Sequence, residues 1–205
     1  GRINTSREYI LSKLEMSLKN SDTSTLSDIV KVDGERVKEK KLESLVEYYS
    51  NGNNKIDTLI TNLKNNNETK DFKLQSKKYF FWNMYYLDVK TFNIKIKSNF
   101  EEGNFILGNS GKVKAGETIK NVIPGNYKIT GSLNSNYEEI KTSKEIVVME
   151  DKEIELNFPA TKITINSDFQ DAEVYINGKD TEKTVSEIKT YGPIPKNKDI
   201  IIYLT

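Results

Sequence analysis

The spacing of hydrophobic residues changes once along the chain, near Asp71. Before that point, apolar residues recur every three or four positions, as in amphipathic helices. The pattern predicts four helices: one capped by Thr5 or Ser6, one starting at Ser24 or Thr25, one over residues 37–49, and one over 56–63 that ends in the asparagines 65–67. Each apolar stripe is narrow, so the helices need one another, and a compact N-terminal bundle is expected.

After Asp71 the period is that of β-strands, and one segment occurs twice. Ile94-Lys-Ile-Lys-Ser-Asn-Phe100 and the strand after it are echoed by Ile163-Thr-Ile-Asn-Ser-Asp-Phe169 and its following strand, at a spacing of about 70 residues. Further short strands are expected over 118–122, 126–133, 145–149 and 153–158, separated by turns. The repeat predicts two small β modules in tandem, in an elongated arrangement.

The predicted fold class is therefore α+β, with an N-terminal helical bundle followed by two small tandem β modules. The predicted domain ranges are 1–76 for the bundle, 77–159 for the first module and 160–205 for the second. The second copy lacks counterparts of the last strands of the first, so it is either a smaller module or truncated. Because the chain ends on an apolar strand whose edge is poorly protected, we expect it to continue beyond Thr205.

Composition excludes several kinds of chemistry. The chain has no His and no Cys, which removes Ser-His-Asp triads, Cys nucleophiles and His- or Cys-ligated metals. A net charge of +1 gives no basic excess for binding nucleic acid. Asp168 and Asp171 lie in a turn without EF-hand spacing and are better explained as turn formers than as calcium ligands. We expect no catalytic, cofactor-binding or metal-binding residues, and no enzyme activity.

Two groups of side chains remain as candidates for contacts with other molecules. Residues 70–97 carry seven lysines, which could form a surface for a ligand or partner or simply be the solvated side of a strand pair; the candidates are Lys73, Lys77, Lys78, Lys90, Lys95 and Lys97. Residues 79–86 are rich in aromatic rings. We expect these to seal the helical bundle against the first β module, with an exposed recognition surface as the alternative; they include Tyr79, Phe81, Trp82 and Tyr86.

The order of these parts resembles the extracytoplasmic region of TcaA-type (teicoplanin-resistance-associated) membrane proteins and their YvbJ-like relatives. The resemblance rests on the segments Lys41-Leu-Glu-Ser-Leu-Val-Glu-Tyr-Tyr49, Lys78-Tyr-Phe-Phe81, Tyr86-Leu-Asp-Val-Lys90, Ile96-Lys-Ser-Asn-Phe100, Val174-Tyr-Ile-Asn-Gly-Lys179 and Gly192-Pro193. The β modules are also similar to PEGA-like domains through Ile123-Pro-Gly-Asn-Tyr-Lys-Ile129.

The resemblance implies a Gram-positive envelope protein with a cytoplasmic zinc ribbon, one membrane helix and a series of outside domains, linked to the response to wall-targeting antibiotics. Gly1 in place of an initiating Met indicates a trimmed chain, so we expect the membrane to be reached only through a segment outside it. The predicted function is a non-catalytic extracytoplasmic module that binds an anionic wall polymer or an envelope protein, or acts as a spacer. The alternative is a carboxylate-dependent hydrolase of a wall glycan.

Overall fold

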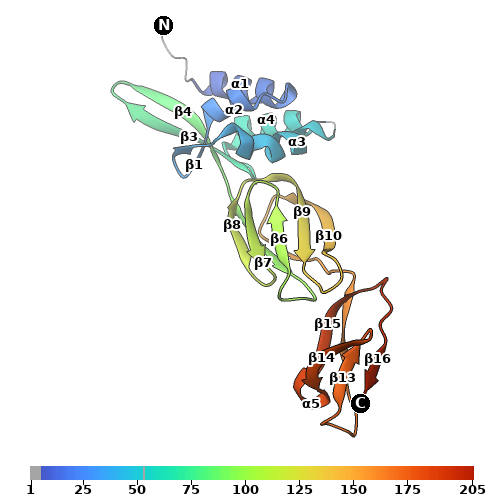
Figure 1. Cartoon of the computed structure of the whole chain (residues 1–205). Helices are drawn as coiled ribbons and strands as arrows, with labels where there is room; N and C mark the ends of the chain where they lie inside the picture. The colour runs from blue at the N-terminus through green and yellow to red at the C-terminus, as the bar shows by residue number, and fades with distance from the viewer. Residues whose placement is uncertain (1–5, 53) are drawn as a thin grey trace.

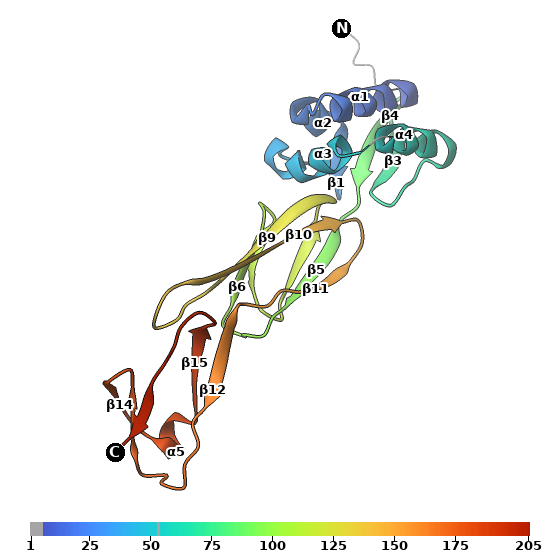
Figure 2. The ribbon, with the colours of Figure 1, turned by 90° about the vertical axis from the view of Figure 1, so that its right-hand side faces the viewer.

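Three bodies follow one another in a line from the N-terminus to the C-terminus (Figures 1 and 2). The computed structural model describes residues 6–52 and 54–205. The elements in chain order are α1(Arg7–Lys19), α2(Thr23–Ile29), β1(Val30–Val32), β2(Glu35–Arg36), the 3-10 helix η1(Glu39–Leu42), α3(Glu43–Ser50), α4(Lys55–Asn66), β3(Phe72–Tyr79), β4(Trp82–Val89), β5(Phe92–Lys97), β6(Asn104–Leu107), β7(Gly111–Lys114), β8(Thr118–Val122), β9(Gly125–Leu133), β10(Ile140–Val148), β11(Lys152–Glu155), β12(Ala160–Thr164), β13(Glu173–Ile176), β14(Lys179–Thr184), α5(Val185–Ile188), β15(Thr190–Pro195) and β16(Ile202–Leu204).

The first two helices begin at polar residues whose side chains bind free backbone N–H groups of the helix start. At the start of α1 the Ser6 hydroxyl accepts the backbone N–H of Tyr9, which confirms the predicted cap. α2 begins earlier than predicted because the Asp22 carboxylate caps it through the N–H of Thr25. The third predicted helix is shorter than expected: η1 occupies part of its first half, and only α3 is α-helical.

The predicted helical bundle is not confirmed, because the helices share their core with a sheet. β2, β1, β4 and β3 form a four-stranded sheet in that order. Phe72, Leu74, Leu87 and Val89 from its two long strands lie in the same hydrophobic core as the leucines of α1, α3 and α4. The narrow stripes on the helices are thus covered by strands that follow them in the chain, and the fold class is α+β with several small sheets.

A buried polar pair joins α3 to the start of this sheet. The Tyr49 hydroxyl donates to Asp71 Oδ2, and the Thr69 hydroxyl donates to Oδ1 at 2.9 Å. Burial raises the pKa of Asp71, while these two hydrogen bonds oppose the rise. Burial, followed by the charge of Asp71, raises the pKa of Tyr49 far above its usual range. The phenol therefore stays protonated and serves as a permanent donor to the carboxylate.

Tyr49→Phe is expected to lower the free energy of unfolding by about 1–3 kcal/mol, because Asp71 keeps its burial and loses a donor. The folded pKa of Tyr49 lies above the unfolded value of about 10, so its stabilising effect is full below that pH and declines as the pH rises beyond it. Urea unfolding at neutral and alkaline pH measures both effects. Tyr48→Phe, at the half-buried neighbour, is the control, and an equal loss in both variants would contradict this role of Tyr49.

The first β module is built from two sheets with one core between them. β10, β9, β6 and β7 form one sheet, and β11, β5 and β8 form the other. Buried side chains from both sheets make up a single cluster, in which the rings of Phe105 and Phe158 lie 5.4 Å apart. The alternating burial along β9 shows one face in this core and one face outward, as the period of two predicts.

The second β module repeats the strand pairing of the first, which confirms the predicted repeat. In the first module β5 pairs with β8, and β6 pairs with both β7 and β9, all antiparallel. In the second, β12 pairs with β15, and β13 pairs with both β14 and β16, all antiparallel. The strands of the two copies stay in separate sheets. Nothing in the second copy corresponds to β10 and β11 within residues 160–205 that the structure describes.

The three hydrophobic cores divide the chain into the same order of parts. The first core ends with Val89 apart from Ile123, the second runs from Ile94 to Ala160, and the third contains Ile165, Val174, Ile176 and Val185. The ranges 1–76, 77–159 and 160–205 stay a prediction of independently folding units. The first boundary falls inside β3, and both β3 and β4 share the core of the helices.

Candidate functional site

The β3–β4 hairpin extends beyond the helices and the rest of its sheet (Figure 1). Its two strands pair in register from Phe72–Val89 at the base to Tyr79–Trp82 at the tip, and Phe80 and Phe81 form the turn. The neighbouring strand β1 pairs with β4 only at Leu87 and Asp88. The outer half of the hairpin is therefore a two-stranded ribbon, in which every residue from 76 to 83 is exposed.

The tip of this ribbon carries four consecutive aromatic residues that face solvent. The exposed fractions are 50% for Tyr79, 70% for Phe80, 97% for Phe81 and 55% for Trp82. The ring of Tyr79 lies 4.7 Å from that of Phe80 and 5.8 Å from that of Trp82, centroid to centroid. The rings of Tyr79, Phe80 and Trp82 thus contact one another. We call residues 77–82 the aromatic tip.

The prediction that these aromatics are buried at a domain junction is wrong. Tyr79, Phe81 and Trp82 lie at the free end of the hairpin, and Tyr86 is half-buried near its base, where Lys31 Nζ lies 4.8 Å from its ring centroid. The physical reason is the position of the turn. Because the chain reverses at Phe80 and Phe81, the strand residues beside them lie at the free end of the hairpin, away from both the helical domain and the first β module.

The actual junction is the turn between β8 and β9. Ile123 belongs to the core of the helical domain, and the Tyr127 hydroxyl donates a hydrogen bond to the Ile123 carbonyl oxygen at 2.6 Å. Gly125 lies so close to α3 that an added Cβ would be 2.3 Å from the Ser44 carbonyl carbon. The sequence predicts a turn at this segment. An isoleucine directly before Pro124-Gly125 was the available signal that the turn is buried.

The structure separates the six candidate lysines into two groups. Lys90 Nζ lies 2.6 Å from Glu68 Oε1, Lys97 Nζ lies 2.8 Å from Glu153 Oε1, and Lys95 stands opposite Glu153 in the sheet. Lys73 stands opposite Asp88. Lys77 and Lys78, in the aromatic tip, form no ion pair within residues 6–52 and 54–205. Lys73 and Lys95 form no ion pair in this part of the chain either, but each faces the charge of a carboxylate across its strand pair. The candidate basic surface is therefore limited to Lys77 and Lys78, beside the four aromatic rings.

Between Asp71 and Asp88, the carboxylates at its base, the hairpin carries charge of one sign. Between Asp71 and Asp88 the sequence contains three lysines and no acidic residue. Lys77 pairs across the hairpin with Met84, and Lys78 pairs with Asn83, so neither ammonium group has an acidic partner on the opposite strand. An exposed apolar group flanked by unpaired cations is typical of a surface that contacts another molecule.

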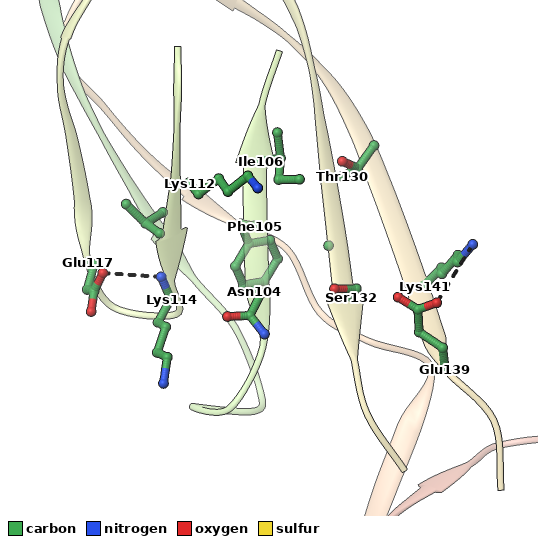
Figure 3. A pocket seen from close by; sticks show the side chains of 12 residues that line it. Asn104, Phe105, Ile106, Lys112, Lys114, Glu117, Thr130, Ser132, Glu139 and Lys141 are labelled. Carbon is green, nitrogen blue, oxygen red and sulfur yellow. Dashed lines mark hydrogen bonds and ion pairs between the residues drawn. The ribbon is translucent and has the colours of Figure 1, made fainter. Parts of the chain in front are cut away.

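A hollow of about 720 Å³ lies on the outer face of the β10-β9-β6-β7 sheet (Figure 3). Its two glutamates are at opposite edges, and each is bound locally: Glu117 Oε2 accepts the backbone N–H of Lys114 at 3.2 Å, and Glu139 lies 4.0 Å from Lys141 Nζ. Apart from these, the lining consists of lysines, small polar residues, Gly131 and the apolar residues Phe105, Ile106 and Val113. The hydrolase alternative gains no support from this site.

Within the described residues 6–52 and 54–205, no group of three or more acidic residues is placed to hold a metal ion. In the same part of the chain, no helix is long and apolar enough to cross a bilayer. What the structure does define is a linear series of small domains that presents an aromatic and basic hairpin.

The C-terminal domain places the chain among known proteins. Residues 159–205 match the family model described as TcaA protein 3rd/4th domain. This confirms the predicted resemblance to the extracytoplasmic region of a TcaA-type protein and indicates a module associated with the cell envelope. No curated protein and no solved structure shows significant similarity to the chain.

A substitution at the tip distinguishes the exposed position of Trp82 from a buried one. Trp82→Ala is expected to change the free energy of unfolding by less than about 0.5 kcal/mol, because an exposed side chain away from the core contributes little. A buried tryptophan would cost about 3–5 kcal/mol. Since Trp82 is the single tryptophan, acrylamide should quench the fluorescence of the native and unfolded protein to a similar degree. Strong protection in the native protein would contradict the exposed position.

Proposed function

We propose that this chain is a non-catalytic, extracytoplasmic binding module of a membrane-anchored envelope protein, and that it contacts an anionic component of the Gram-positive envelope through the β3–β4 hairpin. The TcaA-type domain at residues 159–205 supports the envelope assignment. The observation that supports binding is the aromatic tip, where four rings face solvent and where Lys77 and Lys78 form no ion pair with any residue that the structure describes.

Charge decides which class of component the hairpin favours. Teichoic acids and anionic lipids carry negative charge, and Lys77 and Lys78 offer the opposite charge on an exposed part of the hairpin. Exposed charges are screened within about 10 Å at 0.1 M salt, so binding should weaken as salt is added. The resemblance adds a role in the response to wall-targeting antibiotics, which we include in the proposal.

The test uses isolated cell envelopes that contain both wall and membrane. The chain should co-sediment with them at low salt, and Lys77→Gln with Lys78→Gln should release it. Lys112→Gln with Lys114→Gln removes the same charge from an exposed strand of the first β module and serves as the matched control. Binding that is equal in all three proteins would refute the role of the hairpin lysines.

A spacer function is the second candidate, and it is favoured by the linear arrangement of the three bodies (Figure 2). A spacer needs stiff junctions and no ligand. It becomes the better explanation if the chain fails to bind envelopes at any salt concentration and solution scattering still shows the elongated form.

A further inference from the structure

The turn of the aromatic tip departs from the usual chemistry of hairpin turns. Two-residue hairpins favour Asn-Gly, Asp-Gly or Gly-X because the backbone needs positive φ. Here the turn is Phe80-Phe81, and Phe80 has φ +52°. A bulky residue in this region is uncommon and strained. Packing inside the chain does not offset this strain, since Phe81 is 97% exposed. The turn is poor for folding, so its two apolar side chains point to a contact outside the chain.

Polarity changes in order along the axis of the hairpin. Phe80 and Phe81, which have no polar side-chain atom, stand at the end. The pair Tyr79–Trp82 comes next, followed by Lys78–Asn83 and Lys77–Met84. A strand advances about 3.3 Å per residue, so the backbones of the two lysines lie roughly 7–10 Å behind the end of the turn.

This order matches the layers of a bilayer surface. Apolar side chains of interfacial segments reach about 5–10 Å into the boundary between headgroups and acyl chains. Tyr and Trp are enriched at the level of the headgroups, and lysines extend to the charged surface. Phenylalanine at the leading position, tyrosine and tryptophan behind it and lysine behind those is the same sequence of layers.

We propose that the β3–β4 hairpin is a membrane-docking element, whose aromatic tip inserts into the interface of a bilayer containing anionic lipid. This rests on the proposed function as an envelope module and names its ligand as the lipid surface. None of the hollows found in the described part of the chain that we compared is lined by a residue of the aromatic tip, so no peptide-sized hollow is seen there. A teichoic acid would satisfy Lys77 and Lys78 and leave Phe80 and Phe81 in water, whereas a bilayer accepts both the charge and the apolar end.

Trp82 provides a reporter inside the proposed contact. The complete chain is mixed with vesicles of phosphatidylcholine alone, and with vesicles of equal parts phosphatidylcholine and phosphatidylglycerol. With the anionic vesicles we expect a blue shift of the Trp82 emission, protection from acrylamide, and quenching by lipids brominated on the acyl chain. Emission that stays unchanged with anionic vesicles at low salt would overturn the proposal.

Variants separate the two parts of the tip while keeping the reporter. Phe80→Ser with Phe81→Ser should abolish the blue shift and weaken binding at least about tenfold, since both inserted apolar groups are lost. Lys77→Gln and Lys78→Gln should each weaken binding to anionic vesicles by about fivefold. Lys112→Gln with Lys114→Gln should leave binding unchanged. Far-ultraviolet circular dichroism checks that each variant is folded. Full binding by the double serine variant would overturn insertion.

The outcome also separates this inference from the proposed function. Binding to isolated envelopes and to teichoic-acid-bearing walls, without binding to anionic vesicles, would refute membrane docking and leave the envelope-binding function intact. A chain that binds neither envelopes nor vesicles would refute both and favour the spacer.

Discussion

Gly125→Ala is expected to destabilise the junction between the helical domain and the first β module by about 2–6 kcal/mol, the combined cost of overpacking and backbone strain. The added Cβ would lie 2.3 Å from both the carbonyl carbon and oxygen of Ser44 and 2.6 Å from the Leu45 nitrogen. These are backbone atoms of α3, which cannot rotate away. Gly125 also has φ +152°, a conformation that residues with a side chain rarely adopt.

The expected consequence is a loosened or displaced β8–β9 turn, with Ile123 drawn out of the helical core. Urea unfolding followed by circular dichroism measures the loss of stability, and small-angle scattering measures the change in the distribution of shapes. Gly116→Ala is the matched control: its φ is +85°, and an added Cβ would meet no atom within 4 Å. It should cost only about 1–2 kcal/mol from strain. Equal costs in the two variants would show that the contact with α3 is unimportant.

The local elements of this fold were predictable from the sequence because their causes are local. Ser6 caps α1 through a hydrogen bond three residues away, and the asparagine-rich end of α4 has Asn67 in the left-handed conformation. The tandem repeat was also predictable, since the alternation of apolar residues in both copies specifies which face of each strand is buried.

The partner of the helices was not predictable in the same way. A narrow apolar stripe shows that a helix needs a partner, but it does not show whether that partner is a helix or a sheet. Here Phe72 and Leu87 come from strands that follow the four helices. The alternation of apolar and polar residues in these strands shows which face is buried, but it does not show which element packs against that face.

The error on the aromatic residues has a physical cause that the sequence does contain. Adjacent residues of a strand point to opposite faces, so a run of four consecutive aromatics places rings on both sides. The helices cover only one face of the β3–β4 sheet, so some of these rings had to be outside. The turn at Phe80 and Phe81 could not be located from the sequence, because this turn lacks the glycine and asparagine that usually mark a hairpin.

The role of Phe158 shows how the first module is closed at its C-terminal end. Its buried ring lies 5.4 Å from the ring of Phe105, centroid to centroid. The Asn99 side chain binds both backbone groups of Phe158: its Oδ1 accepts the N–H at 2.9 Å, and its Nδ2 donates to the carbonyl oxygen at 3.0 Å. Gly103 leaves room for the ring, since a Cβ there would lie 2.5 Å from Phe158 Cε2.

Phe158→Ala is therefore expected to lower the free energy of unfolding of the first module by about 3–5 kcal/mol, the range for emptying a buried aromatic site. Phe158 also lies between β11 and β12, so the variant should make the connection to the second module more sensitive to protease. Urea unfolding and limited proteolysis measure the two effects. Phe169→Ala is the control within the repeat, because Phe169 is 76% exposed, and it should change stability by less than about 0.5 kcal/mol. If Phe158→Ala lowered the free energy of unfolding as little as this control, the two hydrogen bonds of Asn99 to the backbone of residue 158 would be sufficient to close the module without the ring.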